Sequence, residues 1–92
     1  MNNHSLIEHA KKYGTPIIEG NQVTFLWMGK TAPHLIDDIH MWEDQPQKLL
    51  RIDKGLWAYS IELPSTAYLE YAFYNPRTKQ RTQDPLNKNT VF

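Results

Sequence analysis

The residues that could carry acid–base or nucleophilic chemistry are not arranged as in known catalytic sites. A serine hydrolase of the α/β class exposes its nucleophile in a Gly-x-Ser-x-Gly turn, and none of Ser5, Ser60 and Ser65 has glycines at those positions. The adjacent carboxylates Asp37 and Asp38 would point to opposite faces of a strand, so they would not act as a pair. The glycines are too scattered for a phosphate-binding loop. We therefore expect no enzymatic activity from this chain and no cofactor.

Three possible metal ligands lie at even spacing in the sequence. His34, Asp38 and His40 would share one face of an extended strand, and imidazole and carboxylate groups are both zinc ligands. The competing interpretation is that these are surface residues in and beyond an edge strand. We favour this second interpretation, so the sequence predicts no metal site.

A basic cluster with nearby aromatic residues suggests contact with single-stranded nucleic acid. Arg77, Lys79 and Arg81 would project from one side of a hairpin, and Tyr68 and Tyr74 could stack on bases. Ten basic residues balance ten acidic ones, however, so the chain has no net field that attracts phosphate or anionic lipid. We favour a solvated hairpin edge that is protected by charge. No nucleic acid or membrane partner is expected.

Trp42 lies in a polar stretch, residues 40–46, where no apolar pattern calls for a large ring. Such a tryptophan either covers the edge of a sandwich or offers a platform for the apolar face of a sugar ring. We favour the covering role and keep the platform as the alternative. Trp27 and Trp57 lie in periodic segments and are expected in the core.

A short helix is predicted at the N-terminus, over residues 5–13. Ser5 and Glu8 have the spacing of a capping box, in which each side chain bonds the other residue's backbone N–H. Gly14 and Pro16 then stop the helix. Its apolar stripe consists of Leu6, Ala10 and Tyr13.

Period-two patterns predict strands in the rest of the chain. The expected strands are residues 22–28, 35–39, 48–52, 56–63 and 68–74. The segment 22–28 is apolar on both faces, so one face should meet the helix or a partner. The expected core residues are Phe25, Trp57, Tyr71 and Phe73. Short, closely spaced strands without intervening helices indicate an all-β sandwich.

Length and composition set the domain organisation. A chain of 92 residues with 40% hydrophobic and 22% charged residues folds as a single domain. We expect residues 1–20 to form a helix and connecting arm, and residues 21–92 to form the sandwich. The sequence contains no cysteine, no signal peptide pattern and no apolar run near 20 residues, which predicts a cytoplasmic protein.

Several segments, taken in order, resemble one family. The matching segments are residues 14–20, 23–27, 35, 38–39, 42, 56–57, 62–64, 69–73 and 84–87. Together they resemble the N-terminal early-set, immunoglobulin-like domain of enterochelin-esterase-like hydrolases. That domain is related to the glycogen-binding modules of isoamylases and of the AMP-activated kinase beta subunit. The resemblance implies an immunoglobulin-like β-sandwich over about residues 14–92.

The resemblance also implies a partner. In the family, a stretch like Asp-Pro-Leu-Asn at residues 84–87 ends the sandwich and leads into an α/β-hydrolase domain with a Ser-His-Asp set. We therefore expect this chain to correspond to the first domain alone. Its expected function is that of a non-catalytic accessory domain, which packs on the catalytic domain in cis or mediates subunit contact in a homo-oligomer.

Glycogen modules of the related type bind sugar through two tryptophans and a lysine. Trp42 matches the first tryptophan, although Asp37 and Ile39 replace a glycine and a phenylalanine of the surrounding motif. Ala72 stands at the position of the lysine, and Arg81 stands in or near that of the second tryptophan. One of the three sugar-binding positions is thus retained, and we expect no measurable glycogen binding.

The alternative function is that of a carbohydrate-binding module for glycogen or starch. Its ligand-binding residues would be Trp42, Arg81 and Tyr74. A single stacking ring contributes about 1–3 kcal/mol, which is little for a shallow groove.

Overall fold

The computed structural model describes residues 2–64 and 69–87 of the chain. Within them lie one α-helix, α1 (Asn3–Tyr13), and a short 3-10 helix, η1 (Trp42–Asp44). The strands are β1 (Ile17–Glu19), β2 (Gln22–Met28), β3 (His34–Asp37), β4 (Gln47–Lys48), β5 (Leu50–Asp53), β6 (Leu56–Glu62), β7 (Tyr71–Asn75) and β8 (Gln80–Thr82).

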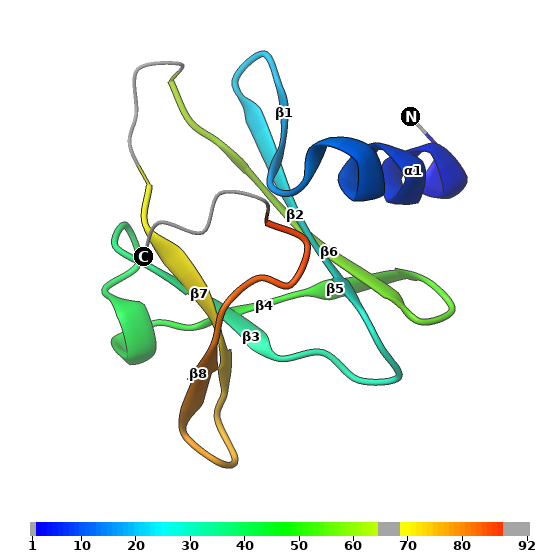
Figure 1. Ribbon diagram of the computed structural model, residues 1–92. Coiled ribbons are helices and arrows are strands. Elements are labelled where there is room, and N and C mark those ends of the chain that lie inside the picture. Colours follow the sequence, from blue (N-terminus) through cyan, green and yellow to red (C-terminus); the bar gives the residue numbers. More distant parts are fainter. Residues whose placement is uncertain (1, 65–68, 88–92) are drawn as a thin grey trace.

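The strands form two antiparallel sheets of four strands each. The first sheet has the strand order β1-β2-β6-β5, and the second has the order β4-β3-β7-β8. Figure 1 shows the two sheets crossing, with α1 beside β1 and β2 on the side away from β7. This arrangement confirms the predicted all-β sandwich with a short N-terminal helix.

The central strands β2 and β6 carry apolar residues on both faces. Phe25 pairs with Tyr59, and the next residue, Leu26, pairs with Ala58. Because successive strand residues point to opposite faces, Phe25 faces the second sheet while Leu26 faces outward. Both side chains are almost fully buried, so both faces of the sheet are covered at this position.

The main core lies between the two sheets. Its buried members are Val23, Phe25, Leu35, Leu49, Tyr71 and Phe73. The ring of Phe25 meets Tyr71 edge-on at a centroid distance of 4.6 Å, and Trp27 meets Phe73 in the same way at 4.9 Å. The predicted burial of Phe25, Tyr71 and Phe73 is confirmed, whereas Trp57 is half-buried at the margin of this core.

A second, smaller core lies between α1 and the outer face of the first sheet. It contains Ala10, Ile17, Leu26, Leu56 and Ala58, with Leu6, Ile7 and Leu86 packed against it. The prediction that one face of residues 22–28 meets the helix is therefore confirmed. An 11-residue helix is marginal alone, so this apolar contact is what stabilises α1.

Helix α1 begins earlier than predicted. The Asn2 side chain, not that of Ser5, caps the helix, and its Oδ1 accepts a hydrogen bond from the Ser5 backbone N–H at 2.8 Å. Asparagine is as good an N-cap residue as serine, and the earlier cap adds residues to the helix. The Nδ2 of Asn3 also donates to the carbonyl oxygen of Ile52 at 3.0 Å, which ties the helix start to β5.

The predicted strand at residues 48–52 is in fact two strands in different sheets. β4 pairs with β3 in the second sheet, and β5 pairs with β6 in the first. The chain crosses between the sheets at Leu49, whose side chain is buried in the main core. A single apolar residue thus fixes the crossing, which a period-two pattern does not reveal.

Other boundaries also differ from the sequence prediction. β3 ends at Asp37 instead of residue 39, because the Asp37 carboxylate accepts from the backbone N–H of His40 and closes a turn. β7 covers residues 71–75, whereas the sequence predicts this strand at residues 68–74, and residue 68 lies outside the described residues. Residues 17–19, expected within a connecting arm, form β1 and pair with β2.

Candidate functional site

The outer face of the second sheet carries a row of polar and aromatic side chains. In the strand register, His34 lies between Lys48 and Tyr74, and Tyr74 lies opposite Arg81. These four residues come from four neighbouring strands and share one face of the sheet. The structure therefore brings the predicted site residues Tyr74 and Arg81 together.

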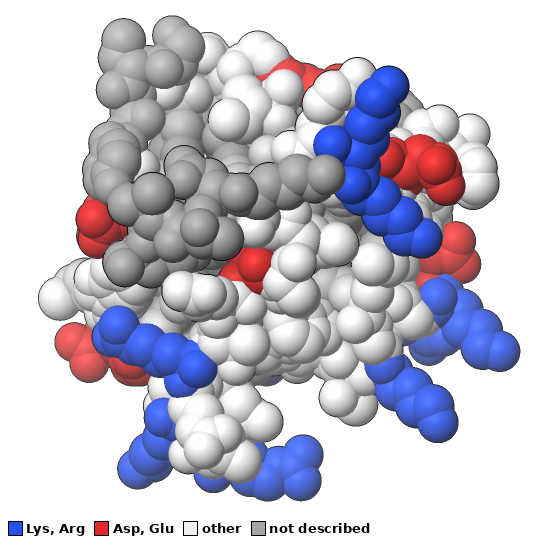
Figure 2. Space-filling view, viewed as in Figure 1, with Lys and Arg blue, Asp and Glu red and all other residues white. Residues whose placement is uncertain are grey.

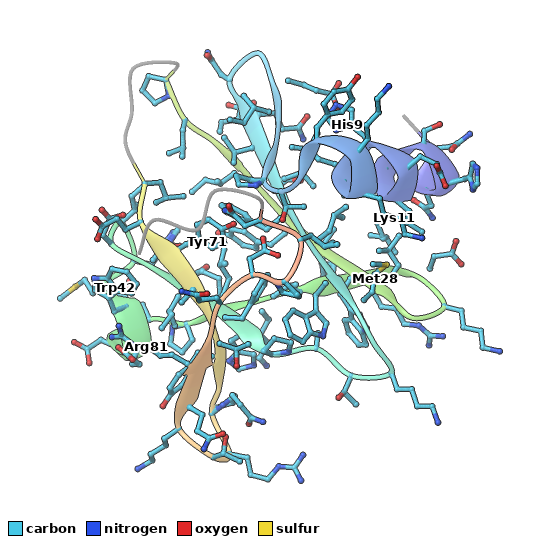
Figure 3. The ribbon with its side chains drawn as sticks, in the orientation of Figure 1. His9, Lys11, Met28, Trp42, Tyr71 and Arg81 are labelled. Carbon is cyan, nitrogen blue, oxygen red and sulfur yellow. The ribbon has the colours of Figure 1, made fainter. Side chains whose placement is uncertain are left out.

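Trp42, the third predicted site residue, reaches the same place from η1. The Arg81 guanidinium lies over the Trp42 ring, 4.9 Å from its centroid (Figure 3). Arg81 also pairs with Glu43 through two parallel hydrogen bonds, and the Nη2–Oε1 distance is 2.8 Å. A bidentate pair of this kind fixes the plane of the guanidinium.

The charges of this pair stabilise each other. The hydrogen bond from Arg81 lowers the pKa of the Glu43 carboxyl, and the bond to Glu43 raises the pKa of the Arg81 guanidinium. Both groups are open to solvent, which screens their attraction. At neutral pH both are ionised, and the guanidinium stays bonded to Glu43 and in contact with the Trp42 ring.

The backbone is strained where the chain enters η1. Met41 and Trp42 have φ values of 63° and 53°, a left-handed conformation that is costly for bulky residues. The turn is anchored at Asp37, which is 1% exposed and whose Oδ1 accepts from the His40 backbone N–H at 2.7 Å. The His40 Nδ1 lies 2.9 Å from both carboxylate oxygens of Asp37.

The position of η1 agrees with a covering role for Trp42. η1 packs against β3, where Ile36 is fully buried although its register places it on the outer face, opposite Ala72. Trp42 is half-buried, and Arg81 lies over its ring. A sugar that stacks on Trp42 would have to use the other ring face or displace Arg81.

The other sequence-derived candidates are not gathered into a site. His40 contacts Asp37, whereas Asp38 contacts the backbone of Glu70, so the proposed set with His34 does not form. Within residues 2–64 and 69–87, no group of three possible ligands could hold a metal ion. Tyr68, the proposed stacking partner of the basic cluster, lies outside the described residues.

A buried polar network was not foreseen from the sequence. The Asp84 carboxylate, 4% exposed, accepts from the hydroxyls of Thr15 and Tyr71, the latter at 2.8 Å. The Nδ2 of Asn87 donates to the Tyr71 oxygen at 2.8 Å, and the Thr15 N–H donates to the Leu86 carbonyl oxygen at 3.1 Å. A period-two strand pattern places Tyr71 inward but does not tell which distant carboxylate it meets.

Comparison with known proteins gives no match to a family model, to a curated protein or to a solved structure. Among the residues that the structure describes, no helix has the length and apolar character needed to cross a bilayer. The resemblance to esterase N-terminal domains therefore rests on the sequence segments themselves and stays a prediction.

Proposed function

We propose that this chain is a non-catalytic accessory domain that packs on an α/β-hydrolase catalytic domain. The observation that carries the proposal is an uncovered apolar surface beside α1. Met28 and Leu50, on the outer face of the first sheet, are 42% and 73% exposed. Their strand partners, Leu56 and Ala58, are buried in the small core under α1.

This surface extends a core that α1 covers only in part. Leu56 and Ala58 belong to the central strand β6, and Met28 and Leu50 lie on the two strands that flank it. All four residues of the edge strand β5 are exposed, and Ile52 adds a further apolar side chain. A neighbouring domain seated there would remove this apolar area from water, which is favourable by about 25 cal/mol per Å².

The strand order supports the immunoglobulin-like assignment within this proposal. Sheets ordered β1-β2-β6-β5 and β4-β3-β7-β8 correspond to the ABED and CFG sheets of immunoglobulin sandwiches, with one added edge strand. The early-set relationship and the esterase context come from the sequence resemblance.

The second candidate function is carbohydrate binding at Trp42. The convergence of Trp42, Tyr74 and Arg81 on one face favours it. Against it stands the Arg81 guanidinium, which lies over the one ring that a sugar would use and is held there by Glu43. We therefore place this candidate second.

The proposal is tested on the native gene product. Mass spectrometry of the purified protein should find an α/β-hydrolase with a Gly-x-Ser-x-Gly turn, in the same polypeptide or as a bound partner. The 92-residue chain alone should hydrolyse p-nitrophenyl acetate no faster than albumin. A native protein with no hydrolase in either place would overturn the proposal, as would turnover by the chain that disappears when one serine is replaced.

Two matched substitutions test the docking surface in that native protein. Leu50→Glu places a charge at the proposed contact and should weaken the association with the hydrolase domain. Ile18→Glu makes the same change on β1, the opposite edge of the same sheet, where Ile18 is 66% exposed. Equal effects of the two substitutions would show that the contact lies elsewhere.

A further inference from the structure

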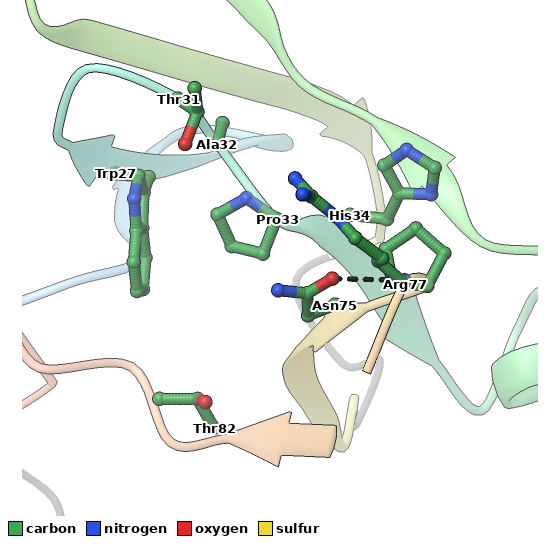
Figure 4. Close-up of a pocket in the computed structure, with 9 residues that line it drawn as sticks. Trp27, Thr31, Ala32, Pro33, His34, Asn75, Arg77 and Thr82 are labelled. Atoms are coloured by element: carbon green, nitrogen blue, oxygen red, sulfur yellow. Dashed lines mark hydrogen bonds between the residues drawn. The ribbon is translucent and has the colours of Figure 1, made fainter. Parts of the chain in front are cut away.

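A cleft opens at one end of the sandwich, between the β2–β3 loop and the β7–β8 hairpin. Its volume is about 310 Å³, at the lower end of the range for small-molecule sites. Trp27, Pro33, Asn75, Arg77 and Thr82 contribute to its lining (Figure 4). It uses neither Trp42 nor Arg81, although His34, from the row on the outer face of the second sheet, also borders it.

The apolar wall of the cleft is the indole ring of Trp27. This ring is half-buried, and its contact with Phe73 at a centroid distance of 4.9 Å holds its orientation. Gly29 lets the chain pass close to the ring, since a Cβ at this position would lie only 3.2 Å from the Trp27 Nε1. The ring is thus a rigid surface of the kind on which sugars stack.

The polar groups of the cleft lie on the opposite side. Figure 4 shows Asn75 and Thr82 facing the space beside Trp27, with the Arg77 guanidinium above them. The backbone N–H of Arg77 donates to the Asn75 Oδ1 at 2.9 Å, which fixes the turn that carries both residues. Amide and hydroxyl groups at this position match the hydroxyls of a sugar.

The charge of the cleft has one sign. Among its described lining residues, Arg77 is a cation and none is a carboxylate. Arg77 makes no ion pair with any residue in the described ranges, in contrast to Arg81. Figure 2 shows basic side chains gathered at the end of the molecule where the β7–β8 hairpin lies. An acid group is the chemistry that this guanidinium would bind.

We propose that this cleft binds a small acidic sugar, whose ring stacks on Trp27 and whose carboxylate or phosphate group pairs with Arg77. The inference does not depend on the hydrolase partner, because all the residues that carry it belong to this chain. It also differs from neutral glucan binding at Trp42, both in place and in the charge of the ligand.

The test is an NMR titration of the isotope-labelled chain, followed through the indole N–H signals of the tryptophans. D-glucuronate and D-glucose 1-phosphate are the probes, and D-glucose and inorganic phosphate are the controls. At least one acidic sugar should shift the Trp27 signal saturably and leave the Trp42 signal in place. D-glucose should bind about tenfold more weakly or worse, since it lacks the charge-assisted bond.

Two substitutions in the same hairpin separate specific pairing from general charge. Arg77→Gln should weaken binding about tenfold or more, whereas Lys79→Gln, which removes one nearby cation, should change it less than about twofold. The proposal would be overturned if neither acidic sugar saturated the Trp27 signal by about 20 mM. The proposal would also be overturned if both variants lost the same affinity for the acidic sugar. It would equally be overturned if D-glucose bound as tightly as the acidic sugars, or if inorganic phosphate bound as tightly as D-glucose 1-phosphate.

Discussion

The hydroxyl of Tyr71 donates to the buried carboxylate of Asp84 at 2.8 Å, and this bond joins β7 to the segment that follows β8. Thr15, just before β1, donates to the same carboxylate oxygen, Oδ2. Three segments far apart in sequence therefore meet at one polar centre between the two cores. A buried carboxylate needs such donors, because losing one leaves it poorly solvated.

We expect Tyr71→Phe to lower the free energy of unfolding by about 1–3 kcal/mol. The substitution keeps the ring in the core and removes only the hydroxyl that Asp84 and Asn87 contact. Urea denaturation followed by circular dichroism measures the change. Tyr74→Phe, on the outer face of the second sheet, is the control and should stay within about 0.5 kcal/mol of the parent. Equal values for the two variants would contradict a stabilising network.

The same residue predicts how stability depends on alkaline pH. Burial raises the pKa of the Tyr71 phenol far above its ordinary value of 10.0. The unfolded chain therefore loses this proton first and binds fewer protons than the folded chain above about pH 10. Stability is fully present below that pH and falls as the pH rises, by up to about 1.4 kcal/mol per pH unit for one such group.

Tyr59 acts in the same direction, since burial and then the Asp37 carboxylate raise its pKa as well. We expect the free energy of unfolding, measured by urea denaturation between pH 9 and about pH 11.5, to fall less steeply with pH in Tyr71→Phe than in the parent. If the free energy of unfolding of the parent stayed constant over this range, the phenol would ionise in the folded protein as readily as in the unfolded chain.

The sequence patterns predict the sandwich well because burial of one face of a strand leaves a period-two trace. Phe25 and Phe73, which alternate with outward-facing neighbours, are fully buried as expected. The patterns fail where one residue decides the outcome. Leu49 carries the chain from one sheet to the other, and Asp37 ends β3 by bonding a backbone N–H three residues later.

The candidate site illustrates the same limit. The sequence singles out Trp42 because no apolar pattern in its polar stretch calls for a large ring, and the resemblance to glycogen modules places Arg81 in or near the position of their second tryptophan. It does not reveal that Glu43 orients Arg81 over that ring, because this depends on how the loop before η1 turns. The sequence does not reveal the cleft at Trp27 either, because the residues that line it lie about 50 positions apart.

The corrected start of α1 gives a third prediction. Asn2→Ala removes the side chain that accepts from the Ser5 N–H, so it should lower the free energy of unfolding by about 1 kcal/mol. Ser5→Ala should cost less, because Ser5 is inside the helix and alanine is the better helix former. Thermal unfolding of both variants measures the difference. A larger loss of stability for Ser5→Ala would indicate that Ser5, as predicted from the sequence, caps the helix.

The main core gives a fourth prediction. Phe73 is fully buried and contacts both Trp27 and Tyr71, so Phe73→Ala should cost about 3–5 kcal/mol. Leu50→Ala removes an apolar side chain that is 73% exposed and should change stability by less than about 0.5 kcal/mol. Both values come from urea denaturation of the isolated chain. A Phe73→Ala variant with the same free energy of unfolding as the parent would contradict the assigned facing of β7.

The last prediction concerns neutral glucans at Trp42. Tight binding in a shallow groove needs more than one open stacking surface, and here Arg81 covers the Trp42 ring while Ala72 offers no polar contact. We expect maltoheptaose to bind with a dissociation constant of about 1 mM or weaker, equivalent to about −4 kcal/mol. Tryptophan fluorescence during a titration measures it, with Trp42→Ala as the control for signals from Trp27 and Trp57. A dissociation constant below about 100 µM that is lost in Trp42→Ala would instead make this surface the binding site of a carbohydrate module.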